Sequence, residues 1–275
     1  MKYTFQLAVS YAEERPLTAP LPLCGELGEA MDYAKSVGFD GIEIHGREYE
    51  FEGEHLQKIR ELREKTGVQI AALVSGRLYS QTQISLAEPE TVKRAWLIAQ
   101  MKKYIDAAAT LKTGVIIGWI RGLFSKGNPK DLYFQILRQS LRELDAYAGE
   151  QNVPLLIEVI NRYEVDCFKR ADETLEFLEK NGLRHSYLHL DTFHMNIEED
   201  DLCGAIRLAG KRLGYFHVAD NTRRYPGSGI LDFSKILETL GEINYGGFVT
   251  VECLPDPDGR KAAKRAAGYL RGLMQ

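Results

Sequence analysis

The 275-residue sequence is poor in several residue types that mark particular classes of protein. Its four cysteines are scattered and form no CxxC pair, which argues against a zinc knuckle, a redox motif or a disulfide framework. Basic residues do not outnumber acidic ones, because the formal net charge is -4. A protein whose main function is to bind nucleic acid usually has a basic face, so we expect no nucleic-acid partner.

Long apolar runs are also missing. The longest, GVIIGWI from Gly114, falls far short of the roughly 18 to 20 apolar residues that a membrane span requires. The N-terminal residues pass only briefly through apolar positions before Glu13 and Glu14, which is unlike a secretory leader. We therefore expect a cytoplasmic protein with no membrane partner.

Eight short runs of aliphatic and β-branched residues recur along the chain. They begin at Phe5, Gly41, Gln69, Gly114, Pro154, Tyr187, Gly214 and Gly247. Successive starts are 36, 28, 45, 40, 33, 27 and 33 residues apart, the length of a strand, a helix and two loops. Eight such units, with no GxGxxG after the first, predict an α/β fold of the (β/α)8 TIM-barrel type rather than an open sheet. No linker marks a second domain, so we expect a single catalytic domain over residues 1–275.

Helical patterns fill the intervals between these runs. Leu27, Met31, Ala34 and Val37 recur at three-to-four spacing, and Gly38 follows them. This pattern predicts a helix that ends at the glycine.

Polar residues stand at the ends of the last four expected strands. Glu158, Asp191, His217 and Glu252 each lie at or near the end of an apolar run. Parallel barrel strands deliver their last residues to one rim, so these side chains should converge. Each alone reads as an ordinary hydrogen-bonded polar group, but burying four of them without a partner would be costly. Three carboxylates and an imidazole favour a site for one divalent cation, Mn²⁺, Mg²⁺ or Co²⁺.

The segments around these residues point to a family. IEVINRYE (157–164), HLDTFHMNIEE (189–199), HVADNTRRYPGSG (217–229) and VTVECLP (249–255) resemble the ketose 3-epimerases of the xylose-isomerase-like TIM-barrel superfamily. VSGRLYSQTQISLAEPE, VIIGWIRG and ECLPDPDG are most similar to the branch that converts 5-keto-L-gluconate to D-tagaturonate.

The resemblance implies an activity and a set of roles. It implies an isomerase that epimerises carbon 3 of a keto-sugar acid or of a ketohexose such as tagatose or psicose, with Mn²⁺ as the preferred metal. A cation chelated by the carbonyl and the adjacent hydroxyl oxygens stabilises the enediolate, and two glutamates on opposite faces move the proton. The implied ligands are Glu158, Asp191, His217 and Glu252, the implied proton-transfer residues are Glu158 and Glu252, and the implied substrate-binding residues are Glu164, His194 and Arg223.

Arg121 forms a separate hypothesis. It follows the fourth expected strand, where its guanidinium would hold a substrate carboxylate in a two-pronged pair. The alternative is a surface arginine on the loop 118–127. Glu43 and His45, at the end of the second expected strand, fit either lining of the site or anchoring of a loop.

Other functions share the expected barrel. An aldose-ketose isomerase, a hydroxypyruvate isomerase and an inosose dehydratase are the nearest alternatives, since fold alone does not separate their chemistries. A repair endonuclease of this fold would need several zinc ions and many histidines, whereas the sequence has six histidines. A sugar-binding protein without activity is less expected because both candidate bases are present. A homo-oligomer, either a dimer or a tetramer, is compatible with the sequence.

Overall fold

A closed ring of parallel strands forms the centre of the molecule. The computed structural model describes residues 3–47, 51–127 and 129–275. Eight strands follow one another around the ring, and the last pairs again with the first. They are β1 (Gln6–Ala12), β3 (Gly41–His45), β4 (Gln69–Val74), β5 (Gly114–Ile117), β6 (Leu155–Glu158), β7 (Ser186–Asp191), β8 (Leu213–Val218) and β9 (Phe248–Val251). The (β/α)8 barrel expected from the sequence is confirmed, and each strand begins within one residue of its predicted start.

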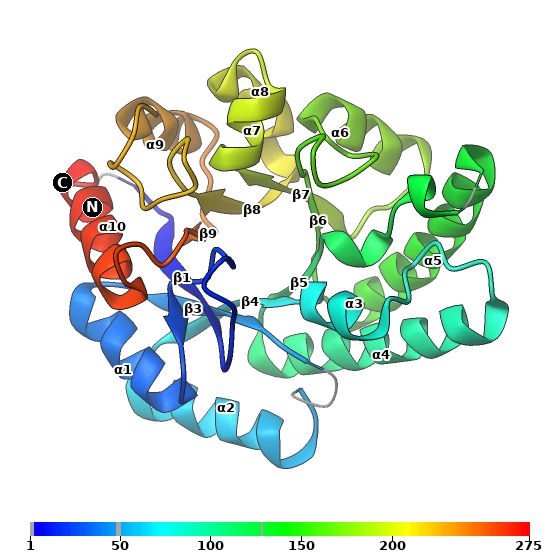
Figure 1. Ribbon diagram of the computed structural model, residues 1–275, viewed down its shortest axis with the longest axis horizontal. Helices are drawn as coiled ribbons and strands as arrows, with labels where there is room; N and C mark the ends of the chain where they lie inside the picture. The colour runs from blue at the N-terminus through cyan, green and yellow to red at the C-terminus, as the bar shows by residue number, and fades with distance from the viewer. Residues whose placement is uncertain (1–2, 48–50, 128) are drawn as a thin grey trace.

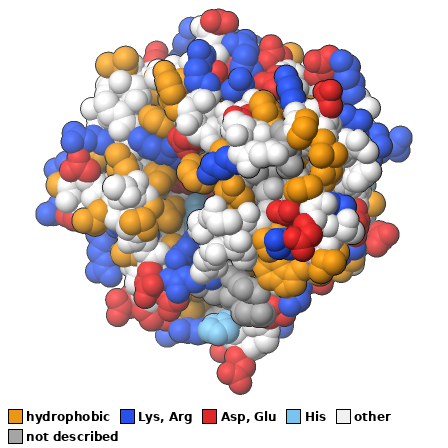
Figure 2. Space-filling view, turned by 45° about the vertical axis from the view of Figure 1, so that its right-hand side comes forward, with side chains coloured by type: hydrophobic (Ala, Val, Ile, Leu, Met, Phe, Trp, Pro, Cys, Tyr) orange, Lys and Arg blue, Asp and Glu red, His pale blue; other side chains and the backbone are white. Residues whose placement is uncertain are grey.

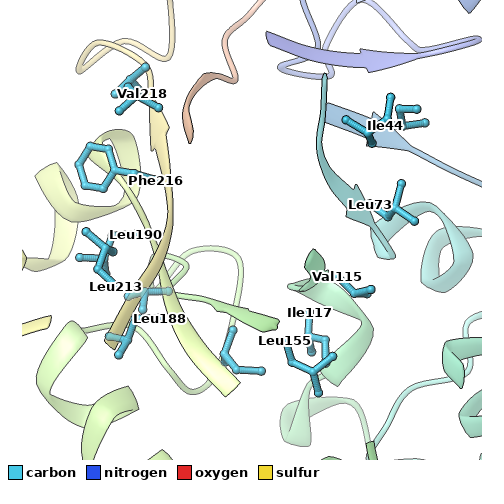
Figure 3. Packing of buried hydrophobic residues seen from close by; sticks show 14 of the residues in the cluster. Ile44, Leu73, Val115, Ile117, Leu155, Leu188, Leu190, Leu213, Phe216 and Val218 are labelled. Carbon is cyan, nitrogen blue, oxygen red and sulfur yellow. The ribbon is translucent and has the colours of Figure 1, made fainter. Parts of the chain in front are cut away.

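Alternation along the strands separates an outer apolar core from the side chains that face the barrel axis, which include polar residues and a second, smaller apolar cluster. In β7, Leu188 and Leu190 belong to the large core between strands and helices, whereas His189 and Asp191 take the intervening positions. Figure 3 shows aliphatic side chains of this outer core on strands β3 to β8. Because successive side chains of a strand point to opposite faces, the polar residues in between turn toward the barrel axis.

The helices cover the outside of the ring (Figure 1). They are α1 (Leu27–Val37), α2 (Gly53–Thr66), α3 (Gly76–Thr82), α4 (Thr91–Leu111), α5 (Lys130–Gln151), α6 (Ala171–Lys180), α7 (Thr192–Glu198), α8 (Leu202–Ala209), α9 (Phe233–Glu242) and α10 (Gly259–Leu273). The predicted first helix is confirmed as α1. It ends at Gly38, whose positive φ of 103° allows its backbone N–H to bond to carbonyls of the last turn.

A short strand absent from the sequence prediction lies beside β1. Strand β2 (Leu23–Cys24) pairs in parallel with Tyr11 and Ala12, and it closes a loop formed by residues 13–22. This loop, dark blue in Figure 1, lies over the middle of the ring. The first βα connection therefore contributes a wall above the barrel mouth.

The outer surface carries mixed charge. Lysine and arginine side chains are interspersed with aspartate and glutamate on the face shown in Figure 2. Among the described residues, no helix has the length and apolar character needed to cross a membrane.

Candidate active site

A cavity of about 610 Å³ opens at the carboxyl ends of the strands. Its walls include Glu158, His217 and Glu252 from the predicted metal set, together with residues of the loop 13–22. This is the end of a parallel barrel at which active sites are built. The volume falls within the range of pockets that hold small molecules.

The four predicted ligands meet at one point in this cavity. Glu158, Asp191, His217 and Glu252 each offer an atom within 4.8 Å of the others. Nδ1 of His217 lies 3.9 Å from Oδ2 of Asp191 and 3.6 Å from Oε2 of Glu252. Atoms that share a cation through bonds of about 2.0–2.3 Å lie at such separations.

Two of these residues have one atom anchored and the other without a partner. Oδ1 of Asp191 accepts a hydrogen bond of 2.7 Å from the backbone N–H of Phe193 and so caps α7. Oδ2 of Asp191 and Nδ1 of His217 are buried and have no hydrogen-bond partner among the described residues. Buried polar atoms are seldom left unsatisfied, and a bound ion is one explanation when they are. The donor set therefore fits a divalent cation.

A buried carboxylate below the site orients the histidine. Oε2 of Glu43 lies 2.7 Å from Nε2 of His217, and Oε1 accepts a 2.7 Å hydrogen bond from Oγ of Ser10. Oε1 of Glu43 also lies 2.9 Å from Nε2 of His45, which lines the cavity. His45 therefore lines the site, which was one of the two alternatives for this strand end. Glu43 neither lines the cavity nor anchors a loop, because its partners Ser10, His45 and His217 lie on strands.

The glutamates at the two ends of the ligand set have opposite pKa shifts. Burial, with the nearby Glu252 carboxylate, raises the pKa of Glu158 from 4.5 to about 8. Burial alone would raise the pKa of Glu252 as well, but His217 and Arg223 hold it below its ordinary value. Burial raises the pKa of Asp191 to about 6. In the cation-free protein near neutral pH, Glu158 is therefore protonated and Glu252 is ionised.

Gly118, just after β5, makes room for one of these carboxylates. A Cβ added at this position would collide with Oε2 of Glu158. Gly118 is also part of the cavity wall. A glycine here allows the close approach that sets the position of the Glu158 carboxylate.

His194 lies on α7 with its ring orientation fixed by an amide. Oδ1 of Asn161 accepts from the backbone N–H of Tyr163, so Nδ2 is the donor that faces Nδ1 of His194 at 2.7 Å. This leaves the His194 proton on Nε2, which lies 3.9 Å from Oε1 of Glu158. Burial and the charge of Arg223 lower the pKa of His194, so the ring is neutral. It presents an N–H donor to the cavity.

Arg223 connects two carboxylates across the mouth of the site. Its Nη2 donates to Oε2 of Glu252 at 2.9 Å, and its Nη1 donates to Oε1 of Glu164 at 3.3 Å. Its guanidinium also lies 4.7 Å from the ring centroid of Phe193. The carboxylate of Asp220, near Arg223 in the sequence, instead accepts hydrogen bonds from backbone N–H groups of the loop 227–231.

Arg121 occupies a different place from the one expected. It is fully buried, and its guanidinium donates to the carbonyl oxygens of Glu158 at 2.6 Å and Cys167 at 3.3 Å. It also lies over the ring of Phe168 and is not part of the cavity wall. The 3-10 turn Trp119–Arg121 directs the side chain beneath the rim. Its guanidinium therefore does not reach the cavity, where it was expected to hold a substrate carboxylate, and it does not take the exposed position of the alternative.

Sequence reasoning missed two of the arginines that reach the cavity. Arg15, on the loop 13–22, and Arg77, on α3, both line it. Nε of Arg15 is buried without a hydrogen-bond partner among the described residues, and Nη2 lies 3.4 Å from the carbonyl oxygen of Pro22. Arg15 belongs to no apolar run, so strand-end reasoning had no signal for it. The inward direction of Glu43, which the sequence left open, could have been predicted because this residue alternates with Ile42 and Ile44.

Fold and site together define a barrel enzyme suited to acid–base chemistry on a small molecule beside a cation. Residues 31–273 match the family model described as xylose isomerase-like TIM barrel, and the chain belongs to that family. It is similar to D-psicose 3-epimerase of Enterocloster bolteae, with 33% identity over 81% of this chain and 75% of the relative. It is also similar to 3-dehydro-D-guloside 4-epimerase of Escherichia coli, with 28% identity over 82% and 86% of the two chains.

A solved structure of a sugar epimerase has the same fold as this chain. The 3-keto-D-glucoside 4-epimerase of E. coli matches with a TM-score of 0.82 and 25% identity, covering 98% of this chain and 99% of that one. The relatives are named as epimerases, which confirms the prediction of an isomerase of the sugar-epimerase class.

Proposed function

We propose that the protein is a divalent-metal-dependent epimerase that inverts carbon 3 of a ketose or of a keto-sugar acid. The observation that carries this proposal is the pair Glu158 and Glu252. They enter the cavity from the ends of β6 and β9, which are not neighbours in the ring, and both belong to the candidate ligand group. Inversion at a carbon needs a proton to leave from one face and return on the other, so two separated bases suit the reaction.

The cation would be held by Glu158, Asp191, His217 and Glu252. It would supply positive charge to the carbonyl and adjacent hydroxyl oxygens, which lowers the free energy of the negative charge that develops as the carbon loses its proton. We propose Mn²⁺ as the preferred ion, because the set of three carboxylates and one imidazole is oxygen-rich.

The remaining residues move protons and orient the sugar. We assign the two proton transfers to Glu158 and Glu252, one removing the proton from the carbon and the other returning one on the opposite face. The roles exchange for the reverse reaction. His194 donates from Nε2 to a substrate oxygen, while Arg223 and Glu164 form a donor and an acceptor for hydroxyl groups nearby.

The relatives share one chemical feature that suits this site. A 3-epimerase of a 2-ketose and a 4-epimerase of a 3-keto sugar both invert the carbon next to a ketone, where the proton is weakly acidic. A glutamate beside a cation is suited to remove such a proton.

An acidic substrate, such as 5-keto-L-gluconate, is favoured by the arginines of the cavity wall. Arg15 and Arg77 offer positive charge, and Nε of Arg15 has no hydrogen-bond partner within the described ranges. We expect Arg15→Gln to lower kcat/KM on 5-keto-L-gluconate and D-tagaturonate by about tenfold, the value of one charge-assisted hydrogen bond. D-tagatose and D-fructose should be converted at an unchanged rate. Equal losses on both groups would remove the support for a carboxylate.

Turnover in deuterated water tests the epimerisation itself. The protein is incubated with Mn²⁺ and each of the four sugars, and the products are read by NMR. We expect inversion and deuterium only at the carbon next to the ketone that is carbon 3 of a 2-ketose and carbon 4 in the numbering of 5-keto-L-gluconate. An aldose-ketose isomerase or a hydroxypyruvate isomerase would exchange at other carbons, and a dehydratase would lose water. Any of these results would replace the proposal, and no turnover with any sugar would leave it without support.

A further inference from the structure

The barrel lumen holds a carboxylate that the proposed reaction does not use. Glu43, on β3, is completely buried and lies below the candidate ligands. Its two oxygens meet three side chains: Ser10 on β1, His45 on the same strand, and His217 on β8. Burying a carboxylate is costly unless it is well paired, and this one has a donor at each oxygen.

The contact with His217 decides which ring nitrogen is available. Nε2 of His217 lies 2.7 Å from Oε2 of Glu43, and a carboxylate oxygen accepts but does not donate when ionised. The hydrogen of the neutral ring therefore belongs on Nε2. Nδ1 is left as a lone-pair donor, and it is this atom that lies buried and unpartnered beside Asp191 and Glu252.

We propose that Glu43 is the positioning residue of the cation site: it fixes the ring of His217 so that Nδ1, and not Nε2, binds the ion. The inference rests on the proposed metal-dependent function. Histidines that bind metals usually donate their second N–H to a carboxylate or carbonyl, and loss of that partner typically lowers affinity about 10- to 100-fold.

The variants Glu43→Gln and Ser10→Ala separate this role from general packing. In Glu43→Gln the side chain keeps its shape but loses its charge, and its NH2 group must face either His217 or the Ser10 and His45 side. Facing His217, it would force the ring hydrogen onto Nδ1 and block the ligand atom. Ser10→Ala removes one donor from Oε1. It leaves the contact with His45 and the hydrogen bond that Nε2 of His217 donates to Oε2 in place.

Titration calorimetry with Mn²⁺ on the chelator-treated full-length protein gives the first test. We expect Glu43→Gln to raise the Kd about 10- to 100-fold, and Ser10→Ala to change it by less than about threefold. Glu43→Asp, which keeps the charge on a shorter side chain, should lie between the wild type and Glu43→Gln. Circular dichroism of each cation-free variant establishes that it is folded, and Glu43→Asp serves as the test if Glu43→Gln is not.

The second test reads the ring directly. In Zn²⁺-loaded protein labelled with ¹⁵N-histidine, we expect the hydrogen of His217 on Nε2 and the metal-bound signal at Nδ1. The reverse assignment in the wild type would overturn the inference while leaving the metal site standing. Wild-type Mn²⁺ affinity in a Glu43→Gln protein whose His217 hydrogen has moved to Nδ1 would do the same. Failure of the wild type to bind any divalent cation would overturn the inference and the proposed function together.

Discussion

Replacing Glu158 with glutamine should stabilise the cation-free protein while abolishing activity. Folding raises the pKa of this carboxyl from 4.5 to about 8. A group with a raised pKa favours the folded state at low pH, and this contribution is lost as the pH rises from 4.5 to 8. Each pH unit above 4.5 lowers the free energy of unfolding by about 1.36 kcal/mol, so the loss of stability at pH 7.5 is up to about 4 kcal/mol. Glutamine carries no charge at any of these pH values, so the variant does not undergo this loss of stability.

The assay is thermal unfolding in a chelator at two pH values. At pH 7.5, Glu158→Gln should raise the Tm by roughly 10 °C, and at pH 5 the two proteins should melt within a few degrees of each other. Turnover with saturating Mn²⁺ should fall by about 10² to 10⁴, the usual contribution of a proton-transferring group.

A matched control replaces a buried glutamate whose pKa is lowered, rather than raised, in the folded protein. Glu198 accepts hydrogen bonds from the side chain and backbone of Arg162 and has a lowered pKa, although burial alone would raise it. Glu198→Gln should therefore lower the Tm at pH 7.5. If Glu158→Gln also lowered the Tm there, or shifted it equally at both pH values, the electrostatic reasoning would be refuted.

Three further predictions concern the surroundings of the site. Gly118→Ala should displace the Glu158 carboxylate and lower kcat by at least about tenfold with a Tm change of only a few degrees, which steady-state kinetics and melting check together. Arg121→Met should lose the bonds to two backbone carbonyls and destabilise the protein by about 3 kcal/mol in denaturant titrations. It should reduce activity equally on neutral ketoses and keto acids, and a selective loss on keto acids would restore a carboxylate-binding role. Cation binding at pH 7 should release roughly two protons, from Glu158 and from His217, and calorimetry in buffers of different ionisation enthalpy measures the number.

Much of the fold could be predicted because barrel strands are short apolar runs at regular intervals. Each run is buried on its helix-facing side, so composition alone marks its position. The short strand β2 could not be predicted, because two residues carry no periodic pattern and their pairing depends on where the preceding loop returns to β1.

The sequence predicts the site residues whose positions follow from the barrel topology, but not those whose side-chain direction depends on local backbone geometry. Strand ends converge in any closed parallel barrel, so Glu158, Asp191, His217 and Glu252 could be grouped without coordinates. The direction of Arg121 depends on a 3-10 turn that nothing in the local sequence required.

The account depends most directly on a single cation shared by Glu158, Asp191, His217 and Glu252. Crystals grown with Mn²⁺, measured on both sides of the manganese absorption edge, test this in one experiment. We predict one anomalous peak in the cavity, about 2.0–2.3 Å from Nδ1 of His217 and from an oxygen of each carboxylate. A cavity without a peak at saturating Mn²⁺, or a peak bound by other residues, would contradict the account.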